Sequence, residues 1–346
     1  MQKIIPHSRP TLNRDEIQAV IAVLESGQIS QGRLVSKFEN NFAKYIGVKG
    51  AVAVNSGTSA LHLCLLALGI KENEEVILST YQCSAVLNAI LYTGARPKFV
   101  DINKDDFNIS FIDTKRKLTR KTKAIILTQM FGLPINILPF RKLGIPLIED
   151  CAQAIGAEHL GRKVGAFGDL SMTSFYATKL ITTGEGGMVF SNNLRLLEKI
   201  RDLRDYDKKN SFKLRFNYKM TDMQAALGIN QLKKLGKFIA RRRYLAKLYN
   251  KVFSNCDFDL PKSSKEHVYF RYVIRVNKDV EKILSASRKN NVICERPVYQ
   301  LLNRYLGQRG YPQAGLAWNS AVSIPIFPGL KSNEQKRVIE VIKKIC

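Results

Sequence analysis

The chain has 346 residues, 45% of them hydrophobic, so it is long enough to bury a substantial core. Lysine and arginine number 55 against 29 acidic residues, and the resulting formal net charge of +26 favours anionic ligands through long-range steering. The basic residues are spread along the chain and accompany no nucleic-acid-binding motif, so we expect no nucleic-acid partner.

The N-terminal stretch has no basic segment followed by an apolar run, and no segment approaches the roughly 18 consecutive apolar residues of a membrane span. We therefore expect a cytoplasmic protein without membrane insertion. The six cysteines show neither CxxC nor Cys/His spacing, so the sequence indicates no disulfide framework and no zinc site.

From about residue 49 to residue 192, short apolar runs alternate with amphipathic stretches, which predicts an α/β fold with a mainly parallel sheet between helices. A helical tract covers 222 to about 249, and the remainder predicts a smaller α+β unit with a strand-like stretch at 267–276 and a helix at 333–345. Such a sheet binds ligands where its strands end and lead into helices. The expected strands are 51–54, 76–78, 97–100, 124–127, 146–148, 171–175 and 187–190, and the expected helices between them are 58–68, 85–92 and 136–143.

Three segments at predicted strand ends carry candidate chemistry. In the first, a buried strand runs through Asn55 to Ser59 into a helix, where Gly57 permits a close turn and the amides of 57–59 point outward at the positive end of the helix dipole. This arrangement suits a phosphate. A small polar turn that only caps the helix has the same composition.

The second segment is a buried strand that ends in Glu149 and Asp150. Asp150 could contact a cationic ring nitrogen, and Gln153 could donate to an oxygen on the same ring. A carboxylate beside a pyridinium nitrogen keeps that nitrogen protonated, and the ring then accepts electrons from a developing carbanion. Acids that merely cap the next helix would have the same pattern.

The third segment runs from Ser171 to Val189 and places Lys179 in a Ser/Thr/Gly-rich loop between two buried strands. A semi-enclosed lysine has a lowered proton affinity and can form an imine, although an isolated lysine is usually a solvated surface residue. The order of phosphate turn, ring acid and lysine, each at a strand end, favours the functional interpretation of all three.

Taken together these residues resemble the DegT/DnrJ/EryC1/StrS family of sugar aminotransferases, which belong to the fold-type-I enzymes that depend on pyridoxal phosphate (PLP). The resemblance implies a large PLP-binding domain with a mainly parallel seven-stranded sheet at 1–235 and a smaller α+β domain at 236–346, with the segment 1–30 packing against the small domain. It extends over nearly the whole chain and rests on segments 5–10, 26–32, 55–62, 75–77, 149–154, 165–169, 174–187, 218–222 and 324–330.

The resemblance also implies roles for individual residues. Lys179 would hold the cofactor as an internal aldimine and move the proton between substrate and cofactor. The remaining cofactor contacts would be Asp150 to the ring nitrogen, Gln153 to the ring oxygen, Gly57, Thr58, Ser59 and Ser174 at the phosphate, and Asn217 at the phosphate of the neighbouring subunit, which implies a homodimer with shared active sites.

Two positions depart from the family pattern. Cys83 stands where the family commonly has an aromatic residue that stacks on the cofactor ring, so Tyr81 is an alternative stacking residue unless it is a buried packing residue. Lys219 stands where the family often has arginine, and a lysine cannot reproduce the bidentate fork.

The implied function is ping-pong transamination from L-glutamate to a nucleotide-linked keto-sugar, with the cofactor alternating between PLP and pyridoxamine phosphate (PMP). A related enzyme acting on a cyclitol or another keto substrate, and a non-catalytic sensor of the same fold, remain alternatives. Lys213, Arg215 and Arg241 are candidates for the nucleotide phosphates. Packing or surface positions are expected for His159 and His267, which could otherwise touch substrate.

Overall fold

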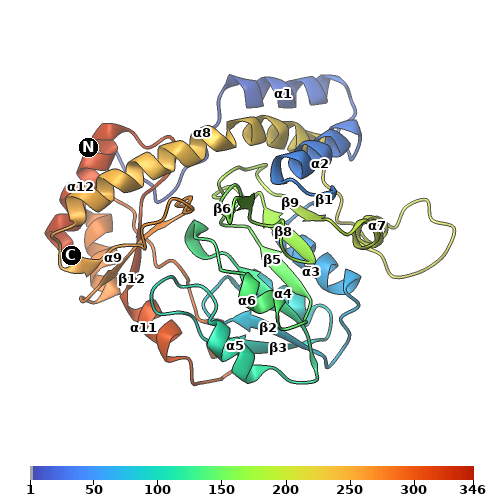
Figure 1. Cartoon of the computed structure of the whole chain (residues 1–346). Coiled ribbons are helices and arrows are strands. Elements are labelled where there is room, and N and C mark those ends of the chain that lie inside the picture. Colours follow the sequence, from blue (N-terminus) through green and yellow to red (C-terminus); the bar gives the residue numbers. More distant parts are fainter. Residues whose placement is uncertain (1–2) are drawn as a thin grey trace.

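The computed structural model describes residues 3–346 and centres on a seven-stranded sheet in the order β1-β9-β8-β5-β4-β2-β3 (Figure 1). Strand β9 runs antiparallel to its neighbours β1 and β8, and the other neighbouring pairs are parallel. The predicted fold class is confirmed, because the seven strands are those expected from the apolar runs. Their bounds are β1 Gly50–Val54, β2 Glu75–Ser79, β3 Arg96–Val100, β4 Thr122–Thr128, β5 Leu147–Asp150, β8 Leu170–Ser174 and β9 Gly187–Ser191.

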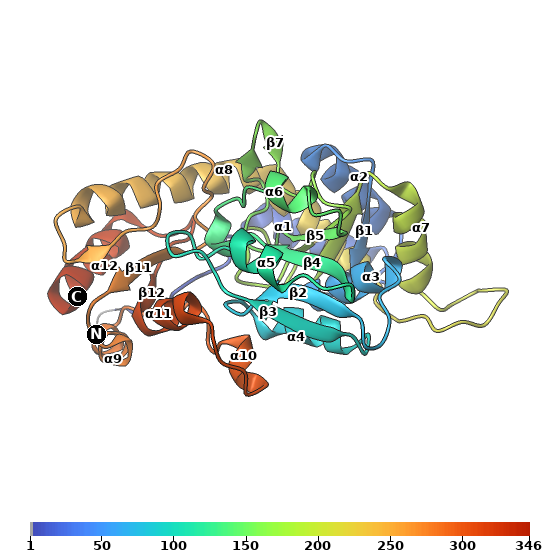
Figure 2. The same cartoon turned by 60° about the horizontal axis from the view of Figure 1, so that its bottom comes forward.

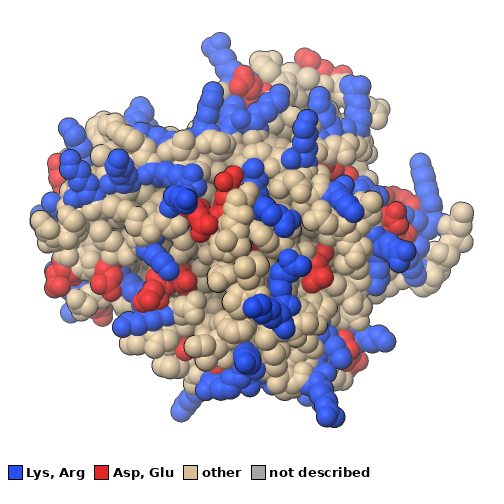
Figure 3. Space-filling view, in the orientation of Figure 1, with Lys and Arg blue, Asp and Glu red and all other residues tan. Residues whose placement is uncertain are grey.

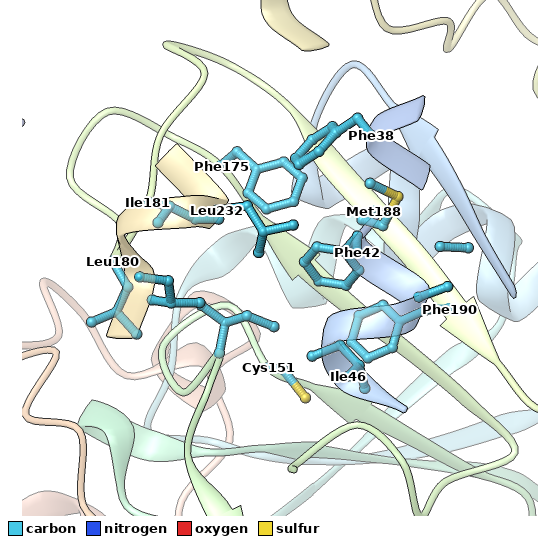
Figure 4. Packing of buried hydrophobic residues seen from close by; sticks show 14 of the residues in the cluster. Phe38, Phe42, Ile46, Cys151, Phe175, Leu180, Ile181, Met188, Phe190 and Leu232 are labelled. Carbon is cyan, nitrogen blue, oxygen red and sulfur yellow. The ribbon is translucent and has the colours of Figure 1, made fainter. Parts of the chain in front are cut away.

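Alternate residues of each strand pack into different cores, as the two-residue period of a strand requires. Val52 and Val54 of β1 belong to the core beneath α3 (Gly57–Ala67), α4 (Ser84–Leu91) and α7 (Leu194–Leu203). Ala51 and Ala53 face the opposite core, beneath α2 (Arg33–Ile46) and α8 (Asp222–Phe253). Figure 4 shows that second core, which gathers aromatic rings from α2 and from both sides of the lysine-bearing loop.

A second, antiparallel sheet of β10 (Phe258–Asp259), β11 (Tyr272–Val276) and β12 (Ala321–Ile324) forms its own core with α9 (Val280–Lys289) and α12 (Ser332–Ile345). Helix α8 joins the two cores without a break, because Leu235 lies in the first and Tyr249 in the second (Figures 1 and 2). The division into two domains at residue 235 stays a prediction.

The N-terminal segment contributes to both parts of the molecule. Ile5 lies in the core of the small sheet and pairs with Val292, while α1 (Arg14–Glu25) packs along α8. Residues 1 and 2 of the predicted segment 1–30 lie outside the described residues. The remaining elements are α5 (Phe111–Lys117), η1 (Met130–Gly132), α6 (Leu138–Arg141), the hairpin of β6 (Glu158–His159) and β7 (Arg162–Lys163), α10 (Leu302–Tyr305) and α11 (Pro312–Ser320).

Two sequence predictions were wrong in extent. The helix expected at 136–143 is the single turn α6. The strand expected at 267–276 is only β11, because the preceding residues bond to η1 instead of to a sheet: Val268 N donates to Gly132 O (3.0 Å) and Arg271 N to Phe131 O (3.4 Å). The left-handed φ of 49° at Tyr269 also interrupts an extended strand.

Lysine and arginine side chains are distributed over the face shown in Figure 3 instead of forming one patch. Within residues 3–346, no helix has both the length and the apolar character needed to cross a bilayer. The same part of the chain brings together no group of three or more His, Cys, Asp or Glu residues suited to a metal ion.

Candidate active site

The carboxyl end of β1 forms an anion-binding turn at the start of α3. Ser56 caps this helix, since its Oγ accepts from Ser59 N (3.0 Å), and Ser59 Oγ donates to Asn55 Oδ1 (2.7 Å). The N–H groups of Gly57 and Thr58 have no acceptor among residues 3–346. Free N–H groups at the positive end of a helix dipole are suitable partners for a phosphate.

Ser174, at the end of β8, lies against this turn. A Cβ atom at position 57 would lie 2.8 Å from Ser174 Cβ, so the approach of the turn to β8 requires glycine. Ser56, Gly57, Thr58 and Ser174 contribute to the lining of a cavity of about 240 Å³. Ser59 does not line this cavity: its N–H donates to Ser56 Oγ and its Oγ to Asn55 Oδ1, and its predicted role at the phosphate stays a prediction.

The adjacent acids at the end of β5 face different surroundings. Glu149 accepts hydrogen bonds from the N–H groups of Gly165 (3.0 Å), Phe167 (2.9 Å) and Gly168 (2.7 Å) and from Gln129 Nε2 (3.1 Å). It therefore fixes the loop 165–168. Asp150 is the acid that lines the cavity.

Asp150 is 4% exposed, and burial raises the pKa of its carboxyl group. Its Oδ1 accepts from Ala152 N (3.0 Å), and its Oδ2 lies 3.1 Å from Thr128 Oγ1. Thr128 lies at the end of β4, and sequence analysis missed it although a polar residue at a strand end was a usable signal. A buried carboxylate with so few donors is suited to a cationic partner.

Lys179 projects into the same cavity from the loop between β8 and β9. The loop is pinned by Phe175 N, which donates to Gly186 O (2.9 Å), and by the burial of Leu180 in the core of Figure 4. Burial lowers the pKa of Lys179, and the Asp150 carboxylate opposes this shift. A lysine with a lowered pKa is more often neutral and nucleophilic.

Gln153 and Cys83 line the cavity as predicted from the sequence. Gln153 Oε1 accepts from Phe131 N (3.0 Å), which orients the side chain and leaves Nε2, 3.8 Å from Met130 Sδ, able to donate to a ligand. Cys83 caps α4 and is exposed to the cavity.

Tyr81 does not line the cavity. It is fully buried in a separate aromatic cluster, stacked on Phe107 with ring centroids 5.7 Å apart and edge-on to Phe131 at 6.4 Å. The alternative that it is a packing residue fits this position, and a role as a stacking partner for the cofactor does not. Tyr176, in the lysine-bearing loop, lines the cavity and was missed by the sequence analysis.

Asn217 lies outside the cavity, at the base of the long connection between α7 and α8. Its carbonyl oxygen accepts from Asn55 Nδ2 (3.4 Å), and its side chain is exposed. The connection extends away from the rest of the molecule in both cartoon views (Figures 1 and 2), and Phe212 within it is fully exposed. Lys219 pairs with Asp205 (2.7 Å).

The two histidines considered from the sequence do not line the cavity. His267 is buried and its Nδ1 accepts from Tyr269 N (3.0 Å), and burial lowers its pKa to about 3. His159 lies in the β6–β7 hairpin, 3.4 Å from a carboxylate oxygen of Glu266.

A larger hollow of about 550 Å³ lies between α1, α2 and α8. It contains none of the predicted site residues. The smaller cavity fits PLP better, because it combines free N–H groups for a phosphate, a buried carboxylate for a ring nitrogen and a lysine for the aldehyde carbon.

Comparison with known proteins supports this interpretation. A family model described as the DegT/DnrJ/EryC1/StrS aminotransferase family matches residues 10–343. GDP-perosamine synthase from Vibrio cholerae is 33% identical over 361 residues, which cover 98% of each chain. The structure is similar to PseC from Helicobacter pylori, an aminotransferase involved in the biosynthesis of pseudaminic acid, with a TM-score of 0.93, 27% identity and 99% coverage of both chains.

A PLP-form structure is also among the relatives. The putative sugar aminotransferase Spr1654 from Streptococcus pneumoniae has a TM-score of 0.93 and 25% identity, over 99% of this chain and 98% of that one. The match to the family model, the overall similarity and the cavity residues agree. The chain therefore belongs to the DegT/DnrJ/EryC1/StrS aminotransferase family, and it is a PLP-dependent aminotransferase.

Proposed function

We propose that the protein transfers an amino group from L-glutamate to a keto-sugar linked to a nucleoside diphosphate, in a ping-pong reaction. The observation that carries this proposal is the meeting of Lys179, Asp150 and the phosphate turn in one cavity, in a chain whose relatives include a GDP-perosamine synthase. The net charge of +26 is consistent with an anionic substrate.

Each residue has a defined task in this proposal. Gly57 and Thr58 would bind the phosphate of PLP through their N–H groups, and Asp150 would keep the ring nitrogen protonated. The bound cofactor supplies an electron sink that stabilises negative charge on the substrate carbon. Lys179 Nζ, when neutral, would accept a proton from that substrate carbon and donate it to the cofactor carbon.

We further propose that the active protein is a homodimer in which Asn217 reaches the phosphate of the partner subunit. Two observations support this arrangement. Asn217 does not enter the cavity of its own chain, and the segment that carries it extends away from the molecule with exposed apolar side chains at Phe212 and Leu214.

The first test is the visible absorbance of the protein reconstituted with PLP, before and after addition of L-glutamate, with Lys179→Ala as control. We expect the wild type to change to the spectrum of the amine form of the cofactor, and the variant to show no covalently bound cofactor.

The second test runs the sugar half-reaction in reverse, with GDP-perosamine as the amino donor to the cofactor. GDP-perosamine is chosen because it is the product in the name of the Vibrio cholerae relative. Conversion with L-glutamate but not with GDP-perosamine would favour another sugar nucleotide, a cyclitol or another keto substrate. A wild-type protein that binds no PLP would contradict the proposal and favour a sensor or binding role.

A further inference from the structure

The ring of Phe270, directly before β11, lies against the lysine of the cavity. Its centroid is 5.0 Å from Lys179 Nζ, which is within the range of a cation–π contact. Within residues 3–346, Lys179 Nζ has no hydrogen-bond acceptor and no ion-pair partner, and Asp150 acts on it only through its charge. The Phe270 ring is therefore a direct contact that can stabilise a charged ε-ammonium group.

Packing and backbone hydrogen bonds fix this ring in place. Phe270 is buried in the same core as Leu180, the residue that follows the lysine. Arg242 Nη1, from α8, donates to Phe270 O (3.0 Å). Two residues earlier in the chain, Val268 N donates to Gly132 O (3.0 Å). The ring is therefore held from both sides and keeps its position when the lysine side chain moves.

The proposed reaction produces a charge at this position. When the amino donor takes over the bond to the cofactor, Lys179 would be released as a free amine. After accepting a proton from the substrate carbon it would be an ammonium group in a buried site. Burial disfavours that charge, and the Asp150 carboxylate would already be paired with the ring nitrogen of PLP. A ring face beside Nζ offsets part of this cost.

We propose that Phe270 is a positioning residue that holds the free ε-ammonium group of Lys179 on the face of its ring during amino transfer. This inference rests on the role proposed for Lys179. The ring keeps Nζ beside the cavity and favours its charged form, which makes the lysine a stronger base. Because a phenyl ring accepts no proton, the ammonium group can still deliver its proton to the cofactor carbon.

Other charges also act on Lys179, and they stay in place when only the ring is changed. Burial lowers the pKa of this lysine and the charge of Arg271 adds to that shift, whereas the charges of Asp150 and Cys83 oppose it. Further titratable groups line the cavities on the two sides of the lysine, namely Tyr176, Glu185, Arg9 and Arg242. Substitutions of Phe270 therefore test the ring against a constant electrostatic background.

The test measures the pKa of Lys179 in the cofactor-free protein. The protein is labelled with acetic anhydride over a series of pH values, and the peptide that contains Lys179 is quantified by mass spectrometry. Phe270→3,5-difluorophenylalanine, introduced at this site alone, keeps the shape of the ring and weakens the negative potential of its face. We expect the labelling midpoint to fall by roughly 0.3 to 1 pH unit, and by roughly 0.5 to 1.5 units in Phe270→Leu.

Phe190 provides the matched control. It is buried in the same core as Phe270 but packs edge-on against Phe42, and no cation lies over its ring in the described part of the chain. Phe190→3,5-difluorophenylalanine should leave the midpoint of Lys179 unchanged. An unchanged midpoint in the Phe270 variant would overturn the proposal, as would an equal shift in the Phe190 variant. The fluorinated ring preserves the packing, so its result stands even where Phe270→Leu does not fold.

The PLP-loaded protein provides the second measurement. At a pH above both labelling midpoints, Lys179 is neutral in wild type and in Phe270→Leu alike. The variant should then convert its bound cofactor with L-glutamate roughly two- to tenfold more slowly, because a weaker base accepts the proton less readily. An equal rate would overturn the role of the ring in amino transfer.

Failure of the proposed function is distinguishable from failure of this inference, because the labelling uses neither cofactor nor donor. A wild-type protein that binds no PLP would contradict the proposed function. A labelling shift in the Phe270 variants would in that case still support the contact between the ring and the lysine charge, and its absence would overturn it.

Discussion

Removing the charge of Asp150 should stabilise the cofactor-free protein while it abolishes activity. The largest influence on the pKa of Asp150 is burial, which raises it and outweighs the attraction to Lys179, so the ionised carboxylate destabilises the empty site. Few hydrogen bonds offset this cost, since Asp150 Oδ1 accepts from Ala152 N (3.0 Å) and Oδ2 lies 3.1 Å from Thr128 Oγ1.

An asparagine at position 150 would remove the buried charge and keep a side chain that can hydrogen-bond to Thr128 Oγ1. We expect Asp150→Asn to raise the unfolding free energy of the cofactor-free protein by about 1–3 kcal/mol at pH 7. With PLP bound, Asp150→Asn should no longer be more stable than the wild type, because the ring nitrogen of PLP has lost its carboxylate partner. The donor half-reaction should slow by roughly 10²- to 10⁴-fold.

Glu149→Gln is the matched control: burial raises the pKa of Glu149 as well, but its four N–H donors make the carboxylate the better acceptor, so we expect the opposite sign. Each carboxylate oxygen of Glu149 accepts hydrogen bonds from two N–H donors. In Glu149→Gln, the amide NH2 would replace one of these oxygens and would stand opposite two N–H groups without accepting from either. We expect a loss of about 1–3 kcal/mol. Urea unfolding monitored by circular dichroism, with and without PLP, measures both variants.

The pH dependence provides a further check on Asp150. Its folded-state pKa is raised, so the folded cofactor-free protein binds more protons than the unfolded chain above the unfolded pKa of about 3.9. Wild-type stability should therefore fall relative to Asp150→Asn as pH rises through the folded pKa, and the difference should vanish in acid. A cofactor-free Asp150→Asn protein less stable than wild type at pH 7 would refute the reasoning.

Three further predictions concern the lysine, the partner subunit and the phosphate turn. The Asp150 carboxylate raises the pKa of Lys179, so Asp150→Asn should move the pH midpoint of PLP uptake to lower pH. Stopped-flow absorbance measures this midpoint, and a shift to higher pH would contradict the prediction. If Asn217 acts across subunits, mixing Lys179→Ala with Asn217→Ala protein should create mixed dimers with one wild-type site and recover activity that neither parent has, whereas action within one chain predicts no recovery. Gly57→Ala should cost about 1–3 kcal/mol of stability and weaken PLP binding in a fluorescence titration, because its Cβ would lie 2.8 Å from Ser174 Cβ; unchanged affinity would exclude the turn as the phosphate site.

Local patterns in the sequence were sufficient to predict the strands of the large sheet. The strands β1, β2 and β4 are buried on both faces. Strands that lie between two helix layers are continuous apolar runs in the sequence, so they could be predicted without a structure. The same reasoning failed for 267–271, where hydrogen bonds to the turn 131–132, far away in the sequence, replace those of a sheet. No local pattern carries that information.

The sequence by itself determined the order of the phosphate turn, Asp150 and Lys179 at strand ends, because strand ends follow from hydrophobic patterning and the polar residues beyond them are visible in the chain. Tertiary structure decided which neighbours these residues have. Glu149 and Asp150 are adjacent acids, yet one fixes a loop and the other lines the cavity, since successive side chains of a strand point to opposite faces. Tyr81 and Cys83 lie two residues apart, but only Cys83 reaches the cavity, because Tyr81 is enclosed by Phe107 and Phe131. Phe270, just before β11, lies against Lys179, with its ring centroid 5.0 Å from Nζ, a contact between residues 91 positions apart that no spacing rule predicts.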